Sequence, residues 1–221
     1  MLILFDIDGT LMDTGGAGLV SLTSAIAKVF GGEGPPLNLA GSTDGGIFRG
    51  LCEYFGRPHD PHLEEDFYQA YLPKLKENLA DESFGGRLLD GATELLAEYR
   101  NAGHTLGLLT GNLARGAAIK VNHYEVGHHF GFGAYGDDHW NRNELGPIAL
   151  TRAEEFAGRR FSANETLVIG DTPKDIACAH AFGAKCLAVA TGAFDEAALH
   201  EAGANEVVGS LVECLGSRGN L

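Results

Sequence analysis

The stretch LILFDIDGTLMDTGG at residues 2–16 decides the fold, because an apolar run ends there in two closely spaced acids. Residues 2–5 are all apolar, as in a parallel strand covered on both faces. Asp6 and Asp8 follow, and residues two apart in an extended chain face the same way. Two such carboxylates repel each other unless a cation lies between them. Asp-Gly alone is ordinary turn chemistry, but DIDGT after an apolar strand favours a site for a hard ion such as Mg²⁺.

Short apolar runs alternate with helical patterns along the rest of the chain. The segments between the runs place apolar side chains three and four residues apart, for example Ala92, Leu95 and Tyr99. This alternation predicts an α/β fold with a doubly wound, Rossmann-like parallel sheet, which binds ligands at the carboxyl ends of its strands. The expected strands are residues 2–5, 105–109, 130–135, 167–169, 186–190 and 206–208.

One long interval after the first strand breaks the alternation. No strand pattern occurs from about residue 13 to residue 86, and an unstructured loop of that length is uncommon. Three helical stripes occupy the interval, and Pro73 is expected to kink or split the last of them. The stripes are Leu19, Leu22, Ile26 and Phe30; Ile47, Leu51 and Phe55; and Leu63, Phe67, Tyr71, Leu75 and Leu79.

Glycine-rich joints at residues 15–18 and 85–86 flank this helical interval. A helical insert on two flexible joints is suited to be a lid, and a helical decoration that does not move is the alternative. The predicted domains are an all-helical cap at residues 14–86 and an α/β core at residues 1–13 and 87–221.

Composition and charge narrow the classes of partner. The chain has 221 residues, of which 44% are hydrophobic and 21% charged, so it can bury a core. The formal net charge of -14 argues against nucleic acid and anionic membrane surfaces, because both repel an acidic protein. Anionic small molecules stay possible, because a metal ion reverses the field inside a pocket.

The sequence indicates neither secretion nor membrane insertion. Its N-terminal apolar run is too short for a signal peptide and has no basic start. The cysteines show no CxxC spacing and lie in apolar segments, which predicts reduced core thiols and a cytoplasmic location. They are Cys52, Cys178, Cys186 and Cys214.

Two further segments place polar residues between a predicted strand and a helix. In LLTGN, residues 108–112, either Asn112 caps the next helix or Thr110 and neighbouring N–H groups form an anion site. In HWNRNELGPIAL, residues 139–150, Arg142 is either a solvated charge or a clamp for an anionic oxygen.

The last such segment is GDTPKD, residues 170–175. Thr172, Pro173 and Asp175 match a capping box at a helix start, so Asp175 has a structural role to set against a functional one. Asp171 lies before that helix, at the end of the predicted strand, and makes a third acid for the cation site.

Taken in order, DIDGT, LLTGN, a basic residue before a helix and GDTPKD resemble the motifs of the haloacid dehalogenase superfamily, from residue 2 to about residue 208. The resemblance implies a cap between the first two motifs. It also implies that Asp6 is a nucleophile forming an aspartyl-phosphate and that Asp8 is the general acid/base. Mg²⁺ would be held by the Asp6 carboxylate, the Asp8 carbonyl and Asp171, with Asp175 orienting them.

The resemblance also implies how the substrate is held. Thr110, with the amides of Gly111 and Asn112, would bind phosphoryl oxygens. Arg142 would take the place where the family usually has a lysine. Lys120 and Lys174, in helical stretches, fit that place less well.

Asp8 discriminates among the activities of the superfamily. Dehalogenases lack this second acid, so Asp8 favours a phosphatase. A closing cap excludes bulky substrates, so a small phosphorylated metabolite is expected, and the protein is expected to be a monomer or homodimer. A sugar-phosphate mutase, which uses a cap arginine, is an alternative; here Asp44 lies at that place and Arg49 a turn later. A non-catalytic phosphate-binding protein is another. Phosphoglycolate-like and sugar-phosphate esters are the first substrates to test.

Overall fold

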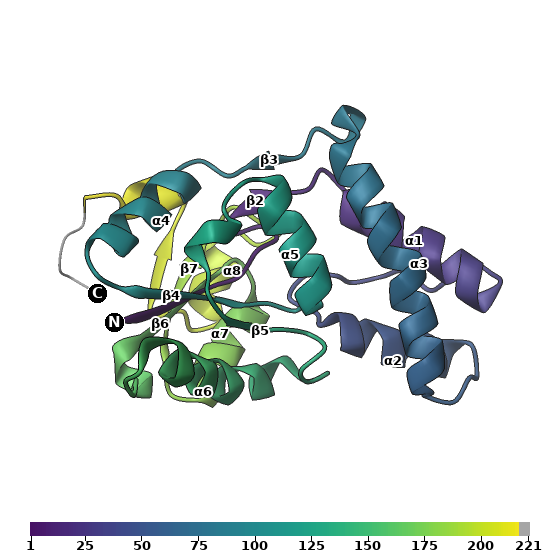
Figure 1. Ribbon diagram of the computed structural model, residues 1–221. Helices are drawn as coiled ribbons and strands as arrows, with labels where there is room; N and C mark the ends of the chain where they lie inside the picture. Colours follow the sequence, from purple (N-terminus) through teal and green to yellow (C-terminus); the bar gives the residue numbers. More distant parts are fainter. Residues whose placement is uncertain (217–221) are drawn as a thin grey trace.

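A six-stranded parallel sheet forms the core of the molecule (Figure 1). The computed structural model describes residues 1–216, so the last part of the predicted core, 217–221, lies outside the described residues. The strand order is β5-β4-β1-β6-β7-β8, and all five neighbouring pairs are parallel. The predicted α/β, Rossmann-like fold class is therefore confirmed. The strands are β1 (Leu2–Phe5), β4 (Thr105–Leu109), β5 (Gly133–Ala134), β6 (Thr166–Gly170), β7 (Lys185–Val189) and β8 (Glu206–Val208).

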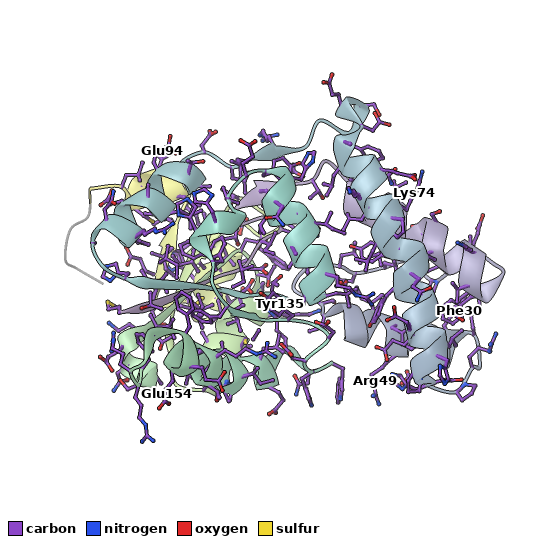
Figure 2. The ribbon with its side chains drawn as sticks, in the orientation of Figure 1. Phe30, Arg49, Lys74, Glu94, Tyr135 and Glu154 are labelled. Carbon is purple, nitrogen blue, oxygen red and sulfur yellow. The ribbon has the colours of Figure 1, made fainter. Side chains whose placement is uncertain are left out.

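Helices cover both faces of this sheet. In β1, Ile3 and Phe5 pack into one apolar cluster and Leu2 and Leu4 into another, so the strand has no polar face. Glu94 on α4 and Glu154 on α6 mark the two helical layers in Figure 2. The core helices are α4 (Ala92–Asn101), α5 (Ala114–His123), α6 (Leu145–Ala157), α7 (Pro173–Ala181) and α8 (Glu196–Glu201). Short 3₁₀ helices are η1 (Glu82–Phe84), η2 (Gly127–His129), η3 (Arg142–Glu144), η4 (Ala163–Glu165) and η5 (Leu211–Cys214).

Three helices inserted after β1 lie beside the sheet (Figure 1) and share a third apolar cluster. They are α1 (Ala17–Phe30), α2 (Asp44–Tyr54) and α3 (Pro61–Ala80), and they match the three predicted stripes. Phe30, Phe48 and Phe67 bring one ring from each helix together, with centroids 5.7–6.2 Å apart. We call residues 14–86 the cap, and the domain boundaries themselves stay a prediction.

Of the two expectations for Pro73, a kink or a split of the last cap helix, the split is wrong, because α3 continues through it. Proline removes one backbone donor, which leaves the carbonyl of Gln69 without its helical partner. Gln69 and Pro73 are both exposed, so water can reach that carbonyl. The buried residues Tyr71 and Leu75 on either side hold the helix against the rest of the cap.

Two short strands that the sequence did not predict join the cap to the core. β2 (Met12–Asp13) and β3 (Arg87–Leu88) pair antiparallel, with Met12 opposite Leu88. Gly15 lies so close to the other connection that a Cβ on it would be 1.8 Å from the carbonyl oxygen of Phe84. The chain therefore leaves and re-enters the core at one place.

The predicted strand at 130–135 is shortened to Gly133–Ala134. Phe130 instead ends η2, and its ring packs edge-on against Phe5 with centroids 6.0 Å apart. Phe130 is therefore packed against the core although it belongs to no strand.

The four cysteines are free and buried, as predicted. Across residues 1–216, no helix combines the length and apolar character needed to cross a membrane.

Candidate active site

The predicted site residues meet at the carboxyl ends of the central strands. Asp6 follows β1, Thr110 follows β4 and Asp171 follows β6, and these three strands are neighbours in the sheet. They line a cavity of about 280 Å³ between the sheet and the cap. Its core wall contains Asp6, Asp8, Thr110, Gly111, Asn112, Lys120, Arg142 and Asp171. Its cap wall contains Leu19, Leu22, Leu39, Ser42, Asp44, Ile47 and Tyr71.

Asp6 is buried against Arg142, which comes from η3 directly before α6. Nη2 of Arg142 lies 3.1 Å from Oδ1 of Asp6 and also contacts Oδ1 of Asp175. Burial raises the pKa of Asp6 to about 6, although Arg142 opposes the shift. Burial alone would lower the pKa of Arg142, but Asp175 and Asp6 raise it overall. Arg142 is therefore a buried, charged bridge between two acids, and its interpretation as a solvated surface charge is wrong.

Asp175 takes part in a helix cap with one oxygen and contacts Arg142 of the site with the other. Its Oδ2 accepts hydrogen bonds from the backbone N–H of Thr172, at 3.0 Å, and from the Thr172 hydroxyl, at 2.7 Å. This is the predicted capping box at the start of α7. The other oxygen, Oδ1, contacts Arg142. Asp175 therefore fixes Arg142 relative to α7.

Asp171 lies in a narrow space bounded by two glycines. A Cβ on Gly9 would lie 2.3 Å from Oδ2 of Asp171, and a Cβ on Gly192 only 1.8 Å from it. Gly9 also has a φ of 79°, in the left-handed region that favours glycine. The Thr10 hydroxyl donates to Oδ1 of Asp171 at 3.1 Å. No pattern in the sequence indicates that Thr10 and Gly192 are neighbours of this acid, because Gly192 is far from it along the chain.

The three buried acids fit a hard divalent cation. One oxygen each from Asp6, Asp171 and Asp175 lies within 4.8 Å of the others. Burial, and then the charges of Asp6 and Asp175, raise the pKa of Asp171 to about 8. Because both Asp175 oxygens already accept hydrogen bonds, Asp6 and Asp171 are the better-placed ligands. Two carboxylates, completed by other oxygen ligands, are a usual protein site for Mg²⁺.

Asp8 has a different cation, Lys120 of α5. Nζ of Lys120 lies 2.8 and 2.6 Å from the two Asp8 oxygens, and 2.7 Å from Oδ1 of Asn112. Asn112 does not cap α5, as one interpretation expected; the N-cap residue is Leu113, and Nδ2 of Asn112 donates to Asp8 at 2.7 Å. The sequence predicted only a weak claim of Lys120 to the site, whereas the structure places its ammonium group on Asp8. Its signal was a lysine on a buried helical stripe, between Ala117 and Val121.

The start of α2 contacts the loop after β4. The backbone N–H of Asp44 donates to the carbonyl of Gly111 at 2.7 Å, and Oδ2 of Asp44 accepts from the N–H of Leu113 at 2.9 Å. A Cβ on Gly111 would lie 1.9 Å from the Ser42 carbonyl oxygen, so this contact requires glycine. Asp44 thus lines the cavity, whereas Arg49 lies over the ring of Trp140 and is absent from the lining residues that the structure describes.

The chain matches the haloacid dehalogenase-like hydrolases over residues 3–189, and it belongs to that family. "Phosphoglycolate phosphatase 1" of Pseudomonas aeruginosa is 26% identical over 197 residues, which cover 86% of this chain and 70% of the relative. "N-acetylmuramic acid 6-phosphate phosphatase" of the same organism is 29% identical over 198 residues, covering 86% and 81%. The solved structure of CbbY from Rhodobacter sphaeroides, in complex with xylulose-(1,5)bisphosphate, matches with a TM-score of 0.74 and 20% identity, covering 96% and 95%. The predicted family and the predicted enzyme class, a phosphatase, are confirmed.

Proposed function

We propose that this enzyme is a Mg²⁺-dependent phosphatase that releases phosphate from a small phosphomonoester through an aspartyl-phosphate. The observation that carries the proposal is the separate pairing of Asp6 with Arg142 and of Asp8 with Lys120. Two neighbouring acids can perform different steps when their surroundings differ. The phosphatase names of the two Pseudomonas relatives support the same reaction class.

Asp6 is the proposed nucleophile and Asp8 the proposed general acid/base. An oxygen of Asp6 attacks phosphorus, the bond from phosphorus to the ester oxygen breaks, and Asp8 gives its proton to the departing alcohol. Water then attacks the phosphorus of the aspartyl-phosphate, Asp8 accepts a proton from that water, the bond from phosphorus to the Asp6 oxygen breaks, and inorganic phosphate leaves the regenerated carboxylate. The side chain of Asp8 is 41% exposed, toward the cavity, which supports proton exchange with substrate and water.

The phosphoryl group has donors at the end of β4. We assign the hydroxyl of Thr110 and the backbone N–H groups of Gly111 and Asn112 to its oxygens. Arg142, which already contacts Asp6, adds a positive charge beside the nucleophile. Phosphoryl transfer depends mainly on such positioning and charge neutralisation.

Magnesium would be held by the carboxylates of Asp6 and Asp171 and by the backbone carbonyl of Asp8. When bound, it would add positive charge beside three buried acids, of which Arg142 contacts two. Asp175 orients this set through Arg142 and the capping box.

A sugar-phosphate mutase and a non-catalytic phosphate-binding protein are the alternative functions. A mutase must hold a second phosphate, yet among the described cavity-lining residues the cap supplies neither lysine nor arginine. Binding alone would not need two acids held by separate cations. Both observations favour hydrolysis.

A panel of phosphate esters tests the proposal. We expect phosphate release with Mg²⁺ and its loss with EDTA, restored by excess Mg²⁺. The panel should contain sugar phosphates, glycerol phosphates, phosphoglycolate and N-acetylmuramic acid 6-phosphate, the last two suggested by the names of the relatives. Isomerised sugar phosphate without free phosphate would support the mutase. Tight phosphate binding with no turnover of any ester would support the binding protein.

A further inference from the structure

We infer that Lys120 is a positioning residue for Asp8, acting together with Asn112; the inference rests on the proposed function. The family resemblance gives Lys120 only a weaker claim to the place that Arg142 takes, and no role toward Asp8. Its ammonium group contacts both oxygens of Asp8, at 2.8 and 2.6 Å. The side chain of Lys120 is only 4% exposed, whereas that of Asp8 is 41% exposed. A buried cation therefore fixes a carboxylate that still faces the cavity.

The hydrogen bonds of Lys120 leave its ammonium group no free donor. An ammonium has three N–H groups, and here two reach Asp8 and the third reaches Oδ1 of Asn112 at 2.7 Å. Asn112 is fixed in turn, because its Nδ2 donates to Asp8 at 2.7 Å and to Oγ1 of Thr110 at 2.9 Å. The chain of contacts runs from the end of β4 to α5 and sets the direction of the Asp8 carboxylate.

The two buried cations of the site are divided between its acids. Arg142 contacts Asp6 and Asp175, whereas Lys120 contacts Asp8. Both acid contacts of Arg142 are made by its Nη2, whereas Lys120 is a compact charge with three rotatable donors. A purely structural lysine would not need to be placed on the acid that faces the cavity. The positions of the two cations thus separate the attacking acid from the acid that moves protons.

A comparison of two leaving groups tests this role in Lys120→Met, which keeps an unbranched side chain one atom shorter and removes the ammonium group. Departure of an alkoxide requires the proton of Asp8, whereas p-nitrophenolate leaves without one. With an alkyl phosphate we expect kcat to fall about 10²-fold or more, within the usual contribution of general acid–base catalysis, and KM to change little. With p-nitrophenyl phosphate we expect a burst of p-nitrophenolate close to the enzyme concentration. Slow turnover follows, because water attack still requires Asp8.

Controls separate this inference from the proposed function. Lys76→Met removes an exposed lysine of α3 and should keep wild-type kinetics without a burst. If Lys120→Met does not fold, Lys120→Arg keeps the charge but cannot reproduce three-point contact, and we expect the same burst with a smaller loss of kcat. An equal loss of kcat for both esters without a burst, or unchanged kinetics, would overturn the inference about Lys120. Turnover by the wild-type enzyme would still leave the phosphatase proposal intact. A wild-type enzyme that releases phosphate from no ester would overturn the proposed function itself.

Discussion

At the scale of single residues, the acids of the site differ in their neighbours more than in their chemistry. Asp6 and Asp175 share Arg142, Asp8 contacts Lys120, and Asp171 has a hydroxyl and two glycines around it. DIDGT and GDTPKD predicted the acids because their spacing is local in the sequence. Lys120 could not be predicted with the same certainty, because its contact depends on how α5 lies against the end of β1.

Asp6→Asn should abolish Mg²⁺-dependent phosphate release without unfolding the protein. The substitution keeps the shape of a buried side chain but removes the attacking carboxylate. Phosphate release and the thermal unfolding midpoint measure the two effects. Asp66→Asn, on an exposed position of α3, is the matched control and should keep full activity. Near-normal turnover of Asp6→Asn would contradict the assignment of the nucleophile.

Gly9→Ala should lower both stability and activity. A methyl group there would lie 2.3 Å from Oδ2 of Asp171, so either the acid or the loop must move. Gly31→Ala is the control, because Gly31 has nearly the same φ, 77°, with nothing within 4 Å of the added Cβ. Left-handed strain alone costs about 1–3 kcal/mol in either variant. We expect urea unfolding to give Gly9→Ala the larger loss, and equal losses with retained activity would contradict the tight contact.

At the scale of elements, sequence periodicity predicted the cap helices because each buries one apolar stripe in a shared cluster. Sequence periodicity did not predict β2 and β3. Strands of two residues carry no period, and Met12 and Leu88 are far apart in the sequence. The apolar run at 130–135 predicted a strand that is too long, because the ring of Phe130 packs into the core from the end of a 3₁₀ helix.

The cap helices also predict a preference among substrates. The cap wall of the cavity is mostly apolar, with Leu19, Ile47 and Tyr71, and its charged member is Asp44. Esters of uncharged alcohols should therefore have a kcat/KM at least about tenfold above that of phosphoglycolate, which corresponds to about 1.4 kcal/mol. Asp44→Asn should reduce this difference in kcat/KM between the two kinds of ester. It removes a negative charge from the cavity wall but keeps an acceptor for the N–H of Leu113.

Competition kinetics with paired esters would measure this preference. Phosphoglycolate as the fastest substrate, unaffected by Asp44→Asn, would contradict it.

At the scale of the whole molecule, we expect the buried acids to couple stability to pH and, through the proposed metal site, to magnesium. The folded-state pKa values of Asp6 and Asp171, about 6 and about 8, lie above the ordinary value of 3.8. Between these values the folded protein binds more protons than the unfolded chain. Its free energy of unfolding therefore falls as pH rises through about 4 to 8. A cation bound between the acids would favour their charged forms and so oppose the rise in their pKa values.

We therefore expect Mg²⁺ to stabilise the protein more at pH 8 than at pH 5.5. At a concentration 100 times its Kd, a ligand adds about 2.7 kcal/mol, and 1 kcal/mol moves the melting temperature of a chain of this size by about 2–4 °C. Thermal unfolding with Mg²⁺ or EDTA at each pH measures the difference. Asp171→Asn should remove most of the magnesium effect. A larger magnesium effect at pH 5.5 would contradict the prediction.

We expect the antiparallel pairing of β2 with β3 to make the cap separable. Its two connections pass through one point of the core, with Met12 opposite Leu88. Paired strands lie about 4.8 Å apart, a gap that a two-residue turn can bridge. A different helical bundle could thus be grafted between these two residues, or the bundle deleted, without changing the register of the six-stranded sheet. The acids would stay at the strand ends while the surface that selects the substrate is exchanged.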